Sequence, residues 1–139
     1  MENNELFERI LSSFEKQSFL ATIGAKLCTV ENGKVVITCE SRSDLAQQNG
    51  FMHAGVISTI ADVACGYAAM STAPDGYNVM SVEFKQNLLR PMTGTKLVVT
   101  GSVVKTGRTL IITGAEAVDA DSGKLIAKML GTMIAVKEK

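Results

Sequence analysis

The segment from residue 52 to residue 73 limits how this chain can fold more than any other segment does. It is apolar on nearly every side and rich in small residues, and between Ala54 and Pro74 it carries a single charge, Asp62. A helix that is apolar all round is stable only when other elements cover it. The segment therefore predicts one long buried helix, with an isolated carboxylate along it.

The rest of the chain consists mostly of strand-like runs. Residues 4–18 have the apolar spacing of a helix, and residues 19–30 and 34–40 are rich in β-formers and flank the turn sequence ENGK. Further strand-like runs cover residues 77–89, 95–105, 109–119 and 124–136, and KTGRT joins the second of these to the third as a hairpin. We expect Gly101, Gly114 and Gly131, inside these runs, to mark bends or bulges. The order of elements predicts an α+β fold, in which one antiparallel sheet curls around one helix.

The composition excludes several classes of protein. A length of 139 residues fits a single domain, residues 1–139. Lysine and arginine balance aspartate and glutamate at 14 each, and no basic run occurs, so we expect no nucleic-acid partner. The acidic N-terminus shows no secretory signal, and the apolar run is too short for a bilayer and is interrupted by Asp62, so we expect no membrane partner. The three cysteines lack CxxC spacing and stand beside one histidine, which predicts no metal site and favours reduced thiols in the cytoplasm.

Three motifs in this order are similar to those of a known family. The stretch HAGVISTIADVACGYA, then SVEFKQNLLRP, then a hairpin containing GR, resembles the phenylacetic-acid-degradation-type acyl-CoA thioesterases of the hotdog fold. The resemblance runs from about residue 20 to the end. It implies a hotdog fold and hydrolysis of an acyl-CoA thioester to a free acid and coenzyme A, with no cofactor beyond the coenzyme A of the substrate. Family members usually read His-Gly-Gly where this chain has His53, Ala54 and Gly55.

The resemblance also implies roles for particular residues. Asp62, nine residues after the histidine, matches the catalytic carboxylate, which either attacks the thioester or activates a water molecule. The N–H of Ala54 matches the donor that polarises the thioester carbonyl. Gln47 matches an Asn or Gln that positions the water or the carbonyl, and Ser81 matches a serine near the nucleophile.

Two patterns in the residues bear on these roles. Five small or polar residues share one stripe of the predicted helix at three- and four-residue spacing: Gly55, Ser58, Thr59, Asp62 and Gly66. This stripe predicts a narrow polar groove along an otherwise apolar helix. Strand alternation, in contrast, places Ser81 on the face opposite Met80, Val82 and Phe84, and so does not by itself show that Ser81 reaches such a groove.

The start of the predicted helix and three basic residues are candidates for binding substrate. Gly55 follows the N–H of Ala54 in the first turn, where free N–H groups stabilise negative charge. We interpret His53 mainly as a residue that shapes the entrance to the site. Arg90, Lys105 and Arg108 lie near strand ends, where they either hold the phosphates of coenzyme A or are ordinary surface charges.

If the active site uses both Ala54 and Asp62, as the resemblance implies, helix geometry requires two chains, whereas a site within one chain would need another donor beside Asp62. At ~1.5 Å per residue, Ala54 and Asp62 are ~12 Å apart along the helix axis, whereas both must reach one carbonyl at roughly 3 to 3.5 Å. One helix cannot supply both groups. We therefore expect a homo-oligomer with active sites at the dimer interface, assembled further as a dimer of dimers.

Three other functions compete with this one. Hotdog hydratases usually carry an aspartate five residues before the histidine, but position 48 is glutamine and the nearest earlier acid is Asp44. A non-catalytic module that binds acyl-CoA would not need Asp62, and a purely structural domain would leave that carboxylate unexplained. The acyl group itself cannot be read from the sequence.

Overall fold

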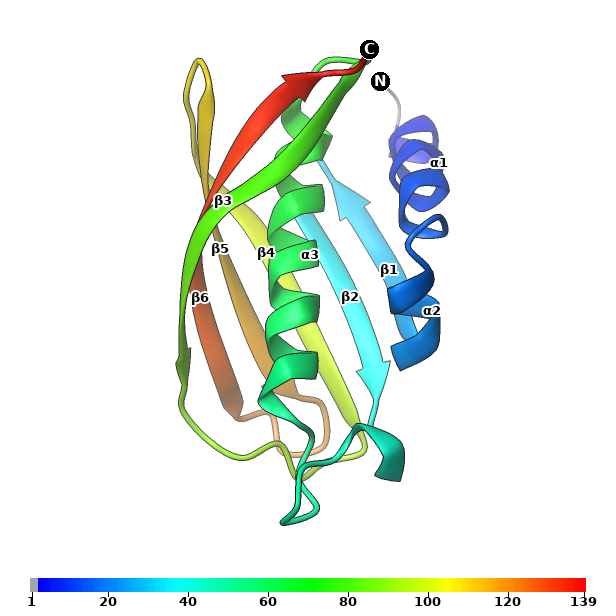
Figure 1. The fold of residues 1–139 in the computed structure, drawn as a ribbon, viewed down its shortest axis with the longest axis vertical. Helices are drawn as coiled ribbons and strands as arrows, with labels where there is room; N and C mark the ends of the chain where they lie inside the picture. The colour runs from blue at the N-terminus through cyan, green and yellow to red at the C-terminus, as the bar shows by residue number, and fades with distance from the viewer. Residues whose placement is uncertain (1–2) are drawn as a thin grey trace.

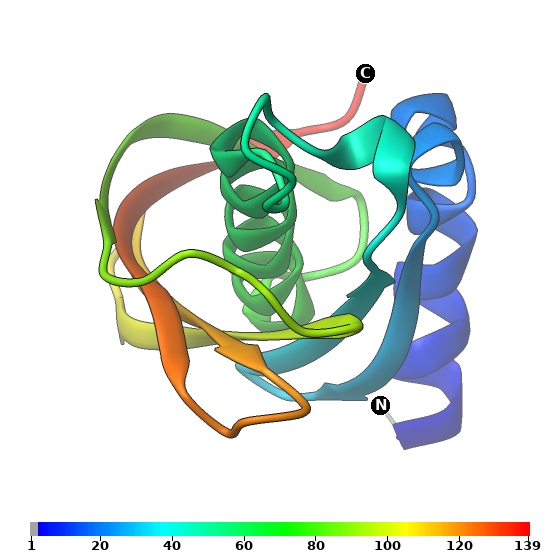
Figure 2. The same cartoon turned by 90° about the horizontal axis from the view of Figure 1, so that it is seen from below.

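The computed structural model describes residues 3–139, in which a six-stranded antiparallel sheet wraps around helix α3 (Ala54–Thr72) (Figures 1 and 2). The strand order is β1-β2-β4-β5-β6-β3. The other elements are α1 (Asn3–Phe14), α2 (Ser18–Ile23), β1 (Ala25–Glu31), β2 (Lys34–Glu40), a 3₁₀ turn (Ser43–Leu45), β3 (Tyr77–Leu88), β4 (Lys96–Thr106), β5 (Leu110–Asp119) and β6 (Leu125–Lys137). The predicted α+β hotdog fold is confirmed.

Helix α3 forms the core because its small residues let the sheet come very close. Ile60, Ala64 and Ala68 are fully buried against the strands. A Cβ atom added at Gly101 of β4 would lie only 2.4 Å from the backbone of Ala64. Gly101 is therefore required for close packing of the sheet on the helix. Gly101, Gly114 and Gly131 do not mark bulges, one of the two outcomes expected for them, because the register shifts of the sheet occur between residues 27 and 29, 81 and 83, 103 and 105, and 117 and 118.

The N-terminal region differs from the sequence prediction. Residues 19–23, expected in a strand, belong to the short helix α2 (Ser18–Ile23), which ends where Gly24 adopts a left-handed conformation with φ of 78°. Leu20 and Ile23 are buried, so these six residues use helical rather than strand spacing to reach the core. Helix α1 ends at Phe14 and packs beside β1 (Figure 1).

Both predicted hairpins are present. Glu31 pairs with Lys34 across a turn in which Gly33 has φ of 83°, and the N–H of Gly107 donates to the carbonyl of Leu110 at 2.8 Å. Strand β3 is an edge of the sheet and pairs with β6 within the described residues. Its outer positions are exposed, and Met80 is 61% accessible.

By length and composition alone, α3 could cross a membrane, which corrects the argument that the apolar run is too short. A helix of 19 residues is long enough to span the apolar layer of a membrane, and a single charged residue does not prevent it from doing so. In the fold the helix instead occupies the concave side of the sheet, as Figure 2 shows end-on. A core helix of a globular domain passes the same test of length and composition.

Candidate active site

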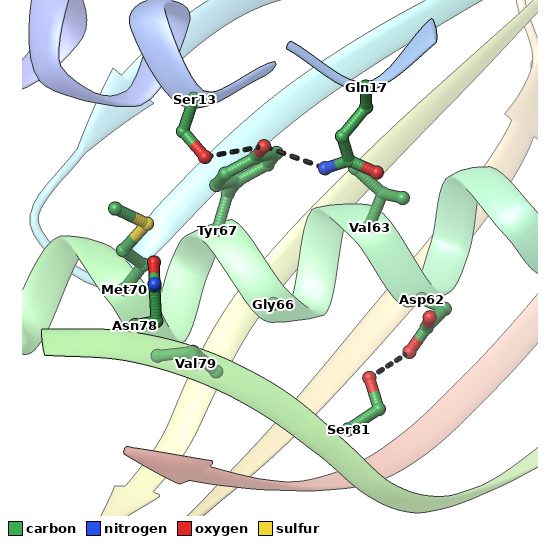
Figure 3. A pocket seen from close by; sticks show the side chains of 10 residues that line it. All are labelled: Ser13, Gln17, Asp62, Val63, Gly66, Tyr67, Met70, Asn78, Val79 and Ser81. Atoms are coloured by element: carbon green, nitrogen blue, oxygen red, sulfur yellow. Dashed lines mark hydrogen bonds between the residues drawn. The ribbon is translucent and has the colours of Figure 1, made fainter. Parts of the chain in front are cut away.

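Asp62 lies halfway along α3 on the one side of the helix that the sheet leaves partly open. The predicted polar stripe is present, because Ser58, Thr59, Asp62 and Gly66 are only partly buried while their neighbours Ile60, Ala61, Ala64 and Cys65 are fully buried. The Ser81 hydroxyl donates a hydrogen bond to Asp62 Oδ1 at 2.6 Å, from β3 (Figure 3). No ion pair within residues 3–139 involves Asp62. The carboxylate is thus half-buried, held by one donor and free of a neutralising cation.

The contact between Ser81 and Asp62 shows which face of β3 meets the helix. Ser81 faces the helix, whereas Met80 and Val82 are exposed. The register of β3 against β6 shifts between Ser81 and Glu83, which is a bulge that inserts one residue. Beyond it Gln86 again faces the helix and donates to the Ser58 hydroxyl at 2.7 Å. Strand alternation therefore holds around Ser81, but the apolar residues of this edge strand face outward, and the bulge changes which residues face the helix only beyond Ser81.

The start of α3 has a free backbone donor at the predicted position. His53 is the N-cap residue, and its Nδ1 accepts a hydrogen bond from the N–H of Gly55 at 2.7 Å. A Cβ at Gly55 would lie 2.9 Å from that nitrogen, so the cap favours glycine there. The N–H of Ala54 has no hydrogen-bond partner within residues 3–139. Ala54 has a negative φ, so alanine in place of the usual glycine introduces no backbone strain.

Gln47 lies near this donor and is held in a fixed orientation. Its Oε1 accepts hydrogen bonds from the N–H groups of Asn49 at 2.6 Å and Phe51 at 3.3 Å. These contacts leave the Nε2 amide of Gln47 as a donor. A cavity of about 400 Å³, which we call the mouth cavity, is lined by Gln47, Phe51, Met52, Ala54, Ile57 and residues 88–92. Gln47 and Ala54 therefore face one common space.

Asp62 and Ser81 line a different cavity, of about 210 Å³, between α3, α1 and β3 (Figure 3). We call it the acid cavity. It shares no lining residue with the mouth cavity. The structure thus brings Asp62 together with Ser81, and Ala54 together with Gln47, but it keeps the two pairs apart within one chain. The ~12 Å of helix axis between Ala54 and Asp62 accounts for this separation.

The three basic residues do not gather at one place in a single chain. Arg90 lines the mouth cavity, and its Nη1 donates to the carbonyl of Leu125 at 2.8 Å. Lys105 and Arg108 are exposed around the β4–β5 hairpin, which lies at the opposite end of the sheet from the start of α3 (Figure 1).

Sequence reasoning missed a polar cluster on the wall of the acid cavity. The Tyr67 hydroxyl accepts from Gln17 Nε2 at 2.7 Å and lies 3.0 Å from the Ser13 hydroxyl. The only available signal was that Tyr67 lies five residues after Asp62 on the same helix. The neighbouring thiol has a different character, because burial raises the pKa of Cys65 to about 11 and keeps it protonated at neutral pH.

Comparisons with known proteins identify the family of this chain. The family model of the thioesterase superfamily matches residues 49–126, a span that contains His53, Ala54, Asp62 and Ser81. A thioesterase family protein from Silicibacter pomeroyi is 39% identical with a TM-score of 0.91, and the match covers 95% of this chain and 98% of that one.

Two further solved structures share the fold. The E. coli PaaI protein of the phenylacetic acid degradation operon has a TM-score of 0.89 at 19% identity, over 99% of this chain and 97% of its own. A Streptococcus mutans protein, solved with acetyl CoA bound, has a TM-score of 0.74 at 26% identity, over 83% of this chain and 91% of its own. The chain therefore belongs to the thioesterase superfamily, as a thioester hydrolase with the hotdog fold.

Proposed function

We propose that this protein hydrolyses acyl-CoA thioesters at sites shared between two copies of the chain. The observation that carries the proposal is the division of the catalytic groups between two cavities. Asp62 and Ser81 face the acid cavity, and the free N–H of Ala54 and the amide of Gln47 face the mouth cavity. A two-fold axis beside the open stripe of α3 would bring the acid cavity of one copy to the mouth cavity of the other.

The hydrogen bond from Ser81 decides which oxygen of Asp62 reacts. Ser81 occupies Oδ1, which leaves Oδ2 to act. In one route Oδ2 takes a proton from water, and the water oxygen forms a bond to the thioester carbon. In the other, Oδ2 itself attacks that carbon, and water later hydrolyses the mixed anhydride. Either route is consistent with a half-buried carboxylate that lacks a neutralising cation.

The start of α3 supplies the complementary electrostatics. As the carbonyl carbon becomes tetrahedral, its oxygen gains negative charge, and the unpaired Ala54 N–H is a donor for that charge. His53 engages the N–H of Gly55, which leaves Ala54 as the free donor in this turn. The carbon–sulfur bond then breaks, and coenzyme A leaves as a thiolate that takes up a proton. We propose no metal or redox cofactor for these steps, because the carboxylate and the backbone N–H supply the chemistry.

Coenzyme A as the thiol part of the substrate is supported by the Streptococcus mutans relative, which binds acetyl CoA. In this chain we assign its phosphates to Arg90 at the mouth cavity and to Lys105 and Arg108 on the β4–β5 hairpin. Arg90 and the hairpin are at opposite ends of one chain. An antiparallel pair of α3 helices would bring the hairpin of one copy toward the mouth of the other. A dimer of dimers remains our expectation for the full assembly.

The direct test is hydrolysis of a panel of acyl-CoAs, from acetyl-CoA to dodecanoyl-CoA, with the released thiol measured by a chromogenic thiol reagent. We expect turnover of at least one member, at a rate that an Asp62→Asn variant does not reach. A p-nitrophenyl ester of the same acyl group serves as the control for general esterase activity. Turnover of the ester with no release of coenzyme A from any thioester would contradict the proposed substrate.

A further inference from the structure

The acid cavity has a polar end that the proposed chemistry does not use. Tyr67 is buried, with 5% of its surface accessible, and its ring packs against Phe14 of α1 at a centroid distance of 6.0 Å. Its hydroxyl meets Ser13 and Gln17 at the cavity wall (Figure 3). Because a phenol has one donor and two acceptor sites, these two contacts leave one site for a third partner.

Two amides at this end also have free hydrogen-bonding atoms. Gln17 makes no side-chain hydrogen bond within residues 3–139 other than the one to Tyr67, and the side chain of Asn78 makes none. Both residues line the acid cavity. Gln17 and Asn78 are exposed, so water hydrates their free atoms, and a hydrocarbon chain bound there would displace that water without replacing its hydrogen bonds. The polar end therefore fits a ligand that carries its own hydrogen-bonding group.

The cavity also has a definite length. The ~7.5 Å of helix axis between Asp62 and Tyr67, at ~1.5 Å per residue, is about the span of a six-carbon acyl chain. Its 210 Å³ corresponds to about seven water molecules at ~30 Å³ each. Gly66 forms part of the wall between these ends, and a Cβ added there would meet no atom within 4 Å. Glycine inside a helix is destabilising by roughly 1 kcal/mol relative to alanine, and here it keeps the cavity open.

We propose that Tyr67, Ser13 and Gln17 are specificity-determining residues that select short acyl groups bearing a hydroxyl or similar polar group at the end remote from the thioester. This inference rests on the proposed function. Ser13 and Gln17 come from the N-terminal helical region, outside the span that matches the superfamily model, so the match assigns them no role. The N-terminal region thus closes the cavity and sets what the shared catalytic groups act on.

The test compares hexanoyl-CoA with 6-hydroxyhexanoyl-CoA, which differ only in the terminal hydroxyl. We expect the wild-type protein to prefer the hydroxylated thioester in kcat/KM by about 3- to 10-fold, the range of one neutral hydrogen bond. Tyr67→Phe should bring that ratio close to one. Gln17→Leu should do the same, and because Gln17 lies on an exposed turn, this substitution should not disturb folding. Tyr77→Phe is the matched control, because Tyr77 is the other tyrosine of the chain and does not line the acid cavity.

A second variant tests the size of the cavity. Gly66→Leu should abolish hydrolysis of both six-carbon thioesters while acetyl-CoA is still hydrolysed, with an unchanged melting temperature as the check on folding. An equal loss on acetyl-CoA and hexanoyl-CoA would contradict the assignment of this cavity to the acyl group.

The outcomes separate this inference from the proposed function. If the wild-type protein hydrolyses both six-carbon thioesters equally well, the function stands and the selection by Tyr67 is overturned. The same holds if Tyr67→Phe keeps the wild-type preference. If no acyl-CoA is hydrolysed at all, the proposed function fails and this inference fails with it.

Discussion

Replacing Asp62 with asparagine removes the charge while keeping the shape of the site. The Ser81 hydroxyl can still donate to the amide oxygen in the place of Oδ1, so the contact between α3 and β3 should survive. What is lost is the carboxylate oxygen that attacks the thioester or takes the proton from water. We expect turnover to fall by about 10²- to 10⁴-fold, the usual contribution of a positioned general base.

This loss corresponds to about 3 to 5 kcal/mol in the barrier, at 1.36 kcal/mol per tenfold change in rate. The same substitution should not lower the stability of the fold. Asp62 is half-buried and no cation within residues 3–139 pairs with it, so a neutral amide removes an unfavourable desolvation. We therefore expect the melting temperature of the variant to equal or exceed that of the wild type.

The assay is release of coenzyme A from the best substrate of the panel, with thermal unfolding followed in parallel. Asp44→Asn is the matched control, because Asp44 is an exposed aspartate paired with Arg42 away from both cavities. It should leave turnover unchanged. An Asp62→Asn variant that folds and retains near-native turnover would refute the assignment of Asp62.

Three further predictions follow from named contacts. Ser81→Ala should reduce turnover by about tenfold through loss of positioning, and it should have little further effect in the Asp62→Asn background, which a double-mutant cycle would measure. Arg90→Ala should raise KM for acyl-CoA but not for the matching N-acetylcysteamine thioester, which lacks the nucleotide; equal effects on both would indicate a folding role. Gly101→Ala should destabilise the fold by about 1 to 3 kcal/mol in urea unfolding, because its Cβ would meet the α3 backbone at 2.4 Å. Gly66→Ala is the control for Gly101→Ala, because a Cβ at Gly66 meets no atom within 4 Å, and it should leave stability unchanged or raise it.

The core of the fold could be predicted because its signals are local. The apolar segment containing Asp62 can be stable only as a covered helix, and the Asn-Gly turn at residues 32 and 33 specifies a hairpin through the positive φ of Gly33. The three- and four-residue spacing of the polar stripe likewise identified the open side of α3 in advance. In contrast, residues 18–23 contain β-formers, but burial of Leu20 and Ile23 against the core overrides that preference.

The parts of the candidate site that could not be predicted depend on contacts between distant segments. Ser81 reaches Asp62 because Met80 and Val82 on the other face of β3 point outward, and no local pattern marks which face of an edge strand meets the helix. The cluster of Tyr67, Ser13 and Gln17 forms where α1 docks on α3, across 50 or more positions of sequence. The sequence places His53 at the start of the helix, but it does not show that the His53 ring accepts a hydrogen bond from the N–H of Gly55.

Complementation between two inactive variants tests the central claim most directly. Asp62→Ala removes the acid, and Ala54→Pro removes the N–H at a first helical position, where proline is tolerated. Each variant alone should be inactive, because every shared site lacks one part.

In an equal co-refolded mixture, random pairing makes half of the dimers mixed, and each mixed dimer contains one intact site. We therefore expect activity from about one site in four. Mixed dimers that are shown to form, for example with two different affinity tags, and that recover no activity would contradict a site shared between subunits.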